Sequence, residues 1–343
     1  MSSQSLVLRP GPRISLRIGR RSLLVGGVLL LLLAALAVAG LVTGDVPVPL
    51  RDVLASLTGG GDAGSAFVVR TLRAPRVLLA VLVGAALGAS GAVFQSMTAN
   101  PLGSPDVIGF TAGAATGGIL AILLVSAEPG PVAAMSVLGG LLTAVAVYLL
   151  AYRHGGVQPF RLVLVGLGAA YTVMSVNWYL ISRASLPDAL VADRWLLGSL
   201  NGADWTTVRA LVVALAVLVP LVALLSRPLA AMEAGDDTSL AQGVRVQRLR
   251  PAIALVGVAL AAVGTAAAGP VAFVAFMAPP IARRLTRAAG PNVTVAGLCG
   301  AVLLVGADLV AQRLLPTPVP VGLVTGLLGG AYLAWLLTRR RTW

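Results

Sequence analysis

The sequence predicts an all-α, polytopic membrane protein with about ten transmembrane helices. Hydrophobic residues make up 58% of the 343-residue chain, charged residues make up only 11%, and the mean hydropathy is +0.94. A soluble domain usually carries about 25% charged residues, so one water-soluble core cannot hide this much apolar surface. Runs such as 23–42 are continuously apolar, whereas strands of a membrane barrel alternate apolar and polar residues. We therefore expect the bilayer as solvent and helices as the spans.

The chain divides into a basic N-terminal segment, 1–21, and a single transmembrane domain, 22–343. The first apolar run is longer than the core of a secretion signal, so it is expected to be a retained helix. Each span needs roughly 20 apolar residues. Glycine and proline between Gly269 and Pro280 predict a helix that breaks inside the protein. The expected helices are 22–43, 75–97, 106–125, 131–152, 160–183, 205–226, 250–268, 271–286, 293–314 and 319–338.

The arginines predict the orientation. With both termini in the cytoplasm, 17 of the 25 arginines fall on the inner side, as the positive-inside rule requires. Arg70, Arg73 and Arg76 are the exception, because they precede the second helix on the outer side. Two interpretations stay open for them. They either anchor a helix end among lipid headgroups or form a basic patch that attracts an acidic partner.

Several functions are disfavoured by residues that the sequence lacks. There is no lysine, so a P-loop cannot form in this chain. Cys299 and His154 are the only cysteine and histidine, which predicts no disulfide and no cysteine- or histidine-based metal site. Zinc-protease and nucleophile-elbow motifs are missing, and the arginines lie between apolar spans instead of forming a nucleic-acid stripe. We expect no catalytic residue, no cofactor, no metal and no nucleic acid.

Charged residues within the spans are scarce, which disfavours a proton relay. Asp308 is the one acidic residue clearly within a late span, and Arg313 follows it. One interpretation is that these two residues pair with each other at a helix end. The alternative of a secondary transporter remains, since sodium sites can be built from backbone carbonyls.

The inner loop 227–250 is the most informative polar segment. Asp236 and Asp237 are expected to cap a short helix by accepting its free N–H groups, and Gly243 is expected to end it in a left-handed turn. A short helix here is a candidate docking element for a cytoplasmic partner. The alternative is a solvated connector.

Taken together, several motifs resemble a known family. The chain is similar to the FecCD-type permeases of ABC importers, which carry ferric siderophores, haem or cobalamin, from about residue 70 to the C-terminus. The first stretch is the most specific. The matching residues are Arg73-Ala-Pro-Arg76, 84–91, Gln95, Asn100-Pro-Leu102, Pro105 and Gly109, supported by Trp195-Leu-Leu-Gly198-Ser199, Gly269-Pro-Val-Ala-Phe-Val274 and Pro320-Val-Gly322.

The resemblance implies a type II ABC importer permease fold and a set of partners. It implies a second permease copy or a sister permease, ABC ATPase subunits inside, and a periplasmic or lipid-anchored solute-binding protein outside, all within membrane lipids. It also implies roles for individual residues. These are binding-protein docking by Arg73, Arg76 and Arg313, ATPase coupling by Gly235, Asp236, Asp237, Leu240 and Gly243, and a translocation path with Gln95, Asn100, Ser175 and Asn177.

Other interpretations stay open. Ser175 and Asn177 also suit plain interhelical hydrogen bonding, and a membrane scaffold or enzyme subunit without a transport role is a rival. The chain departs from the family pattern at three positions. Pro280 replaces a histidine, Pro318 replaces a glutamate, and Arg313 lies five residues after Asp308 instead of four. On a regular helix this last change turns Arg313 by roughly 100°, which makes it the weakest docking candidate.

Overall fold

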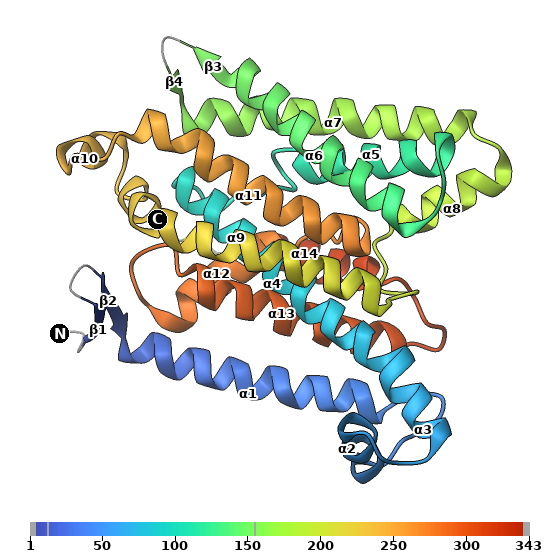
Figure 1. Ribbon diagram of the computed structural model, residues 1–343. Helices are drawn as coiled ribbons and strands as arrows, with labels where there is room; N and C mark the ends of the chain where they lie inside the picture. The colour runs from blue at the N-terminus through green and yellow to red at the C-terminus, as the bar shows by residue number, and fades with distance from the viewer. Residues whose placement is uncertain (1–4, 12–13, 154–155, 339–343) are drawn as a thin grey trace.

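The computed structural model describes residues 5–11, 14–153 and 156–338, and helices dominate it (Figure 1). His154, Arg13 and the three arginines at 339–341 lie outside the described residues. Two small antiparallel hairpins were not expected. One joins β1 (Ser5–Gly11) to β2 (Ile14–Gly19), and the other joins β3 (Tyr152–Arg153) to β4 (Gly156–Val157).

Each of the ten predicted segments contains a helix. Seven helical stretches of the described chain are long and apolar enough to cross a membrane, and 110–124 and 321–336 form shorter apolar helices. The ten are α1 (Arg20–Val42), α4 (Ala74–Met97), α5 (Phe110–Leu124), α6 (Pro129–Ala151), α7 (Pro159–Arg183), α9 (Trp205–Met232), α11 (Val246–Ala268), α12 (Val274–Thr286), α13 (Val293–Leu309) and α14 (Val321–Thr338).

The connections carry further helices. The short helices α2 (Leu50–Thr58), α3 (Ala63–Phe67) and α8 (Leu186–Leu196) and the π-helical η1 (Val68–Arg73) lie outside the ten predicted segments. The inner loop contains α10 (Asp236–Ala241), and a second π-helical turn, η2 (Val310–Leu314), extends α13.

Three predicted boundaries were wrong by four residues or more, one of them the start of α11, at Val246 instead of 250. The third span starts at Phe110 instead of 106, because residues 98–109 fold into turns that bring Gly109, at φ +86°, against Ala170. The sixth span continues to Met232 through Pro220 and Pro228. Neighbouring groups in a membrane protein can satisfy the backbone that an internal proline frees. The inner connection is consequently shorter than predicted, covering 233–245.

The predicted break between α11 and α12 is confirmed. Gly269 and Phe273 both have positive φ, at +71° and +66°. The carbonyl of Ala268, left free by the break, accepts a hydrogen bond of 2.7 Å from the backbone N–H of Ser199. A Cβ on Gly198 would lie 2.6 Å from the carbonyl oxygen of Pro270. Gly322 also packs on the backbone of 197–198. The three motifs that contain Gly198, Gly269 and Gly322 therefore meet at one point.

Helix α4 is the most enclosed long span, with α9, α11, α12 and α13 packed around it (Figure 1). Its glycines allow backbone-to-backbone contact. Added Cβ atoms on Gly84, Gly88 and Gly91 would come within 2.4 Å, 2.3 Å and 1.8 Å of carbonyl oxygens on α13 and α12. Helices in lipid associate mainly through such close packing of small residues. The glycine content therefore has a structural cause in this helix.

Gly91→Ala tests this packing. The new methyl group would overlap the carbonyl oxygen of Ala275, and we expect a loss of at least about 1–3 kcal/mol from overpacking. The measurement is the yield of monodisperse protein in detergent and its thermal midpoint. Gly26→Ala is the matched control, because nothing lies within 4 Å of its Cβ position. Equal yields and midpoints for the two variants would contradict the close-packing account.

Candidate functional site

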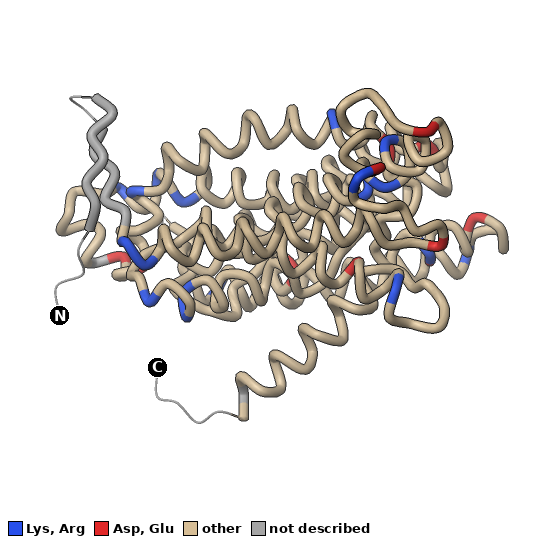
Figure 2. Tube along the Cα trace, turned by 90° about the horizontal axis from the view of Figure 1, so that it is seen from below, with Lys and Arg blue, Asp and Glu red and all other residues tan. Residues whose placement is uncertain are grey.

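Charged residues lie mostly toward the two ends of the helix bundle, with few between them (Figure 2). The two ends correspond to the two termini of α4. Arg73 and Arg76 stand at its start, and Ser96 at its finish contacts Glu233. Arg73 and Arg76 therefore lie at the opposite end of α4 from Arg283, which binds Gln95. We describe the two polar clusters in turn.

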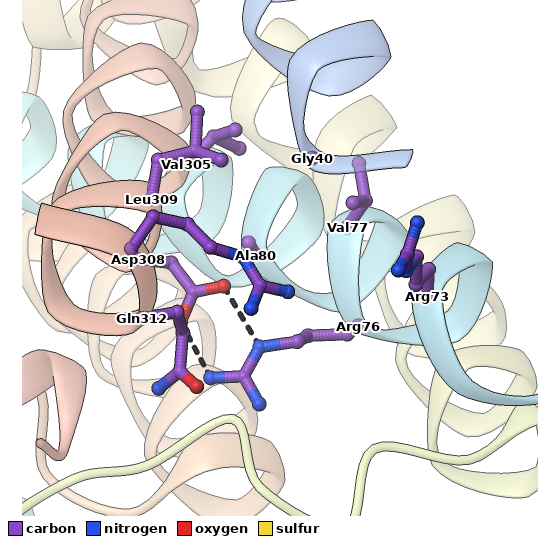
Figure 3. Close-up of a pocket in the computed structure, with 10 residues that line it drawn as sticks. Gly40, Arg73, Arg76, Val77, Ala80, Val305, Asp308, Leu309 and Gln312 are labelled. Carbon is purple, nitrogen blue, oxygen red and sulfur yellow. Dashed lines mark hydrogen bonds and ion pairs between the residues drawn. The ribbon is translucent and has the colours of Figure 1, made fainter. Parts of the chain in front are cut away.

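At the start of α4, Arg76 forms a two-pronged ion pair with Asp308 of α13 (Figure 3). Its Nε donates to Oδ2 at 2.8 Å and its Nη2 donates to Oδ1 at 2.7 Å, while Nη1 donates to Oδ1 of Asn201 at 2.7 Å. Paired N–H groups match a carboxylate in geometry as well as charge. The expected pairing of Asp308 with Arg313 was therefore wrong.

Arg73 is buried, with 8% of its surface exposed. Its guanidinium donates to the carbonyl oxygens of Leu41 at 2.7 Å, Val42 at 3.2 Å and Val46 at 2.5 Å. The last carbonyls of a helix lack partners within the helix, and a cation is favoured at that end by the helix dipole. Arg73 thus closes the end of α1 and has little surface left for another protein.

Arg313 faces the same pocket as Arg73 and Arg76. It belongs to the π-helical turn η2, whose hydrogen bonds span one residue more than those of an α-helix. That extra residue offsets the one-residue shift from the family spacing. The side chain of Arg313 is 32% exposed, and its only ion pair within the described chain is a 3.5 Å contact with the exposed Asp45. It is therefore the most accessible cation of the three.

The pocket has a net positive charge. Three guanidinium groups are balanced by Asp308, which is 11% exposed in its side chain, and by Asp45, which lies fully in solvent. Arg70 adds a fourth basic side chain nearby, held to the carbonyl of Ser56 while its own carbonyl accepts from Trp205. Such an arrangement suits binding of a carboxylate from another molecule.

The second cluster surrounds α10. The Nη2 of Arg250 lies 2.6 Å from Oδ1 of Asp236, and the buried Ser239 donates to the carbonyl of Ala231 at 2.8 Å. These contacts hold one face of α10 against α9 and α11, whereas Leu240 is 59% exposed on the helix. An exposed leucine on a short polar helix is a suitable contact for a partner protein.

The expectations for this loop are partly confirmed. Gly243 does adopt the left-handed conformation predicted after the helix, at φ +78°. The capping prediction was wrong for Asp236, because the N-cap is Gly235, at φ +95°, with no side-chain cap among the described side chains. Asp236 instead binds Arg250. The side chain of Asp237 lies outside the part that the structure describes.

Glu233 connects the end of α9 to two other helices. Its Oε1 accepts from Oγ of Ser96 at 2.5 Å and lies 3.5 Å from Nη1 of Arg283 on α12. Arg283 also donates to Oε1 of the fully buried Gln95 at 2.7 Å, and Gln95 donates to the carbonyl of Phe276 at 3.0 Å. Glu233 and Arg283 line a pocket together with Asn100.

The four residues expected along a translocation path do not come together. Gln95 and Asn100 lie at the inner end of α4, and Asn100 accepts from the backbone of Leu102. Ser175 is exposed on α7 and donates to the carbonyl of Tyr171 at 2.9 Å. Asn177 is 4% exposed and accepts from Thr116 at 2.6 Å. The side chain of Asn177 is therefore bonded to Thr116 within this chain. Of the two α7 residues, only Ser175 lies on the exposed face of that helix.

Sequence reasoning missed Asn201, Glu233, Arg250 and Arg283 as parts of these clusters. Arg250 carried a usable signal, since it is the last charge before the long apolar run of α11. Glu233 and Arg283 offered a weaker one, because each stands where an apolar span meets its connecting segment. The partner of each depends on packing between helices distant in sequence, which no local pattern shows.

The apolar spans, the broken helix and the charges confined to both ends define a multi-pass membrane transport protein. The family model described as the FecCD transport family matches residues 30–339. The chain belongs to this family, whose members are permease subunits of ABC importers, and so it is a transporter component and not an enzyme.

Known relatives agree over most of the chain. It is 45% identical to the ferric enterobactin transport system permease protein FepG of Escherichia coli, over 90% of this chain and 94% of that protein. It is 39% identical to the achromobactin transport system permease protein CbrC of Dickeya dadantii, over 91% and 90%. A solved inward-facing structure of a metal-chelate type ABC transporter superposes with a TM-score of 0.80 at 25% identity, covering 93% of this chain and 99% of that one.

Asp308→Asn tests the ion pair between Arg76 and Asp308. This pair belongs to the outer cluster, which consists of Arg73, Arg76, Asp308 and Arg313 around one pocket. The substitution keeps the shape of the side chain but leaves the partly buried Arg76 without its carboxylate. We expect a loss of about 1–3 kcal/mol, less than the roughly 3–5 kcal/mol for a fully buried pair. The measurement is the thermal midpoint of the purified chain. Asp45→Asn in the same pocket is the control, and no shift is expected there because Asp45 is solvent-exposed. A midpoint for Asp308→Asn that matches the control would contradict the assignment.

Proposed function

We propose that this chain is the membrane-channel subunit of an ATP-driven importer of ferric siderophores. The observation that carries the proposal is the 45% identity to a ferric enterobactin permease along nearly the whole of both chains. The second relative is by name an achromobactin transport system permease protein. Because this chain has no lysine, the P-loop that binds ATP must belong to separate ABC ATPase subunits.

The proposed mechanism is alternating access. A loaded periplasmic or lipid-anchored binding protein docks at the outer cluster through acidic side chains. Arg313 offers the most exposed cation, and Arg76 contributes the edge of its guanidinium that faces Asn201, away from Asp308. ATP binding then draws the ATPase subunits together and displaces α10. Leu240 on α10, with Gly235 and Gly243 on either side of the helix, forms the contact with the ATPase. The chelate passes inward as the helices reorient.

The channel requires a second permease copy or a sister permease. In support, the exposed face of α7 mixes hydroxyl groups with aromatic rings, including Ser175, Thr172, Tyr171 and Trp178. A face that meets only lipid tails is normally apolar, and polar side chains in spans usually face protein or a water-filled path. We propose that this face meets the partner permease around the translocation path.

We place the protein in the plasma (inner) membrane with both termini in the cytoplasm. The arginine distribution supports this orientation, and it puts α10 on the ATP-containing side. The same orientation puts the pocket of Arg73, Arg76 and Arg313 outside, where a binding protein is present.

Uptake of radioactive iron, supplied as a ferric siderophore to iron-starved cells, tests the function. Deletion of the gene should abolish uptake. Arg313→Glu should lower uptake by about tenfold or more at normal membrane levels, because like charges facing each other cost several kcal/mol at an interface.

The matched control is Arg209→Glu, an exposed arginine near the start of α9 and outside the pocket. Unchanged uptake in the deletion strain would rule out that siderophore as the unique substrate, and haem and cobalamin would be measured next. Normal uptake with Arg313→Glu would contradict docking through Arg313.

A further inference from the structure

Arg250 is a buried cation near the start of α11. Only 1% of its surface is exposed, and it is among the largest fully buried side chains of the described residues. Its one carboxylate partner there is Asp236, the first residue of α10, at 2.6 Å. Taking a charge out of water is costly unless it is paired. The position of Asp236 is therefore tied to that of Arg250.

The same guanidinium reaches a third element. Its Nη1 donates to the carbonyl oxygen of Val157, while the backbone N–H of Val157 donates to Oε1 of Gln247 at 3.3 Å. Val157 is fully buried, and it stands two residues before the start of α7 at Pro159. Two side chains of α11 thus hold both backbone polar groups of the residue that leads into α7.

Helix α10 begins directly after a glycine. Gly235 precedes it with φ +95° and ψ 157°, a conformation that other residues rarely adopt. After Gly235, Asp236 and Ser239 fix α10 to α11 and α9, and Leu240 stays exposed. A push on the exposed face therefore acts first on the Asp236–Arg250 pair.

We propose that Arg250 is a positioning residue that transmits displacement of α10 to the start of α7. The inference rests on the proposed function, in which ATPase subunits move α10. Separating Asp236 from Arg250 would leave a buried charge unpaired, so the low-energy motion carries α10, the start of α11 and Val157 together. The helix that receives this motion is α7, whose open face carries Ser175.

Arginine is required for this role. Its planar fork presents several N–H groups at fixed angles, so one side chain can bind a carboxylate and a carbonyl at once. A lysine ammonium has the same charge, but it is a point charge on a flexible stem. Arg250→Lys should therefore retain the charge and lose part of the connection.

Hydrogen exchange on the full chain in lipid nanodiscs tests the connection directly. With Asp236→Asn, the backbone amide of Val157 and those of the first turn of α7 should exchange faster by about tenfold, as local opening becomes easier. Asp236→Glu, which retains the carboxylate, should exchange like the wild type. Arg227→Gln removes an exposed charge from α9 and is the matched control. Unchanged exchange with Asp236→Asn would overturn the inference.

Transport by the reconstituted complex, with its ATPase and binding protein, tests the transmission. We expect Arg250→Lys to keep ATP hydrolysis per assembled complex and to lower iron chelate imported per ATP by about tenfold. A proportional loss of hydrolysis and import would indicate a merely structural role and overturn the inference. A wild-type complex without ATP-dependent import of any chelate would instead overturn the proposed function.

Discussion

The close approach of α4 to its neighbours determines where both polar clusters lie. In a bilayer there is little hydrophobic gain when two apolar helices meet, so association depends on packing density. Gly84, Gly88 and Gly91 let α4 reach the backbones of α13 and α12. The 24 residues of α4 span about 36 Å. The single helix α4 therefore places Arg76 beside Asp308 at one end and Ser96 beside Glu233 at the other.

Arginine chemistry organises both ends of this lysine-free chain. Arg73 joins three backbone carbonyls, Arg76 joins a carboxylate and an amide, and Arg250 joins a carboxylate and a carbonyl. Each guanidinium connects elements distant in sequence, because its fork has several directed donors.

The sequence predicted the helices well because length and apolarity decide a span in lipid. It predicted the break at Gly269 because glycine and proline act locally. The predicted helix boundaries were wrong where tertiary contacts determine the end of a helix, as at Met232, where α9 continues through two prolines. The predicted partner of Asp308 was wrong for the same reason, since its partner in the structure, Arg76, is 232 residues away in sequence. The spacing argument against Arg313 assumed a regular α-helix, and the π-helical turn η2 removed that assumption. Such a turn depends on strain in the packed helix, which residue spacing does not show.

The way α1 is held has a consequence for biosynthesis. Only 6% of its most apolar window is buried, so its side chains add little to the folded core. Its far end is closed by Arg73, which is 32 residues from Leu41, and its near end by a 2.8 Å hydrogen bond from Arg21 to the carbonyl of Leu285, 264 residues away. During translation the contact with Arg73 can form soon after the start of α4 is made, whereas the contact with Leu285 can form only when most of the chain has been made. The near end of α1 therefore joins the folded subunit late.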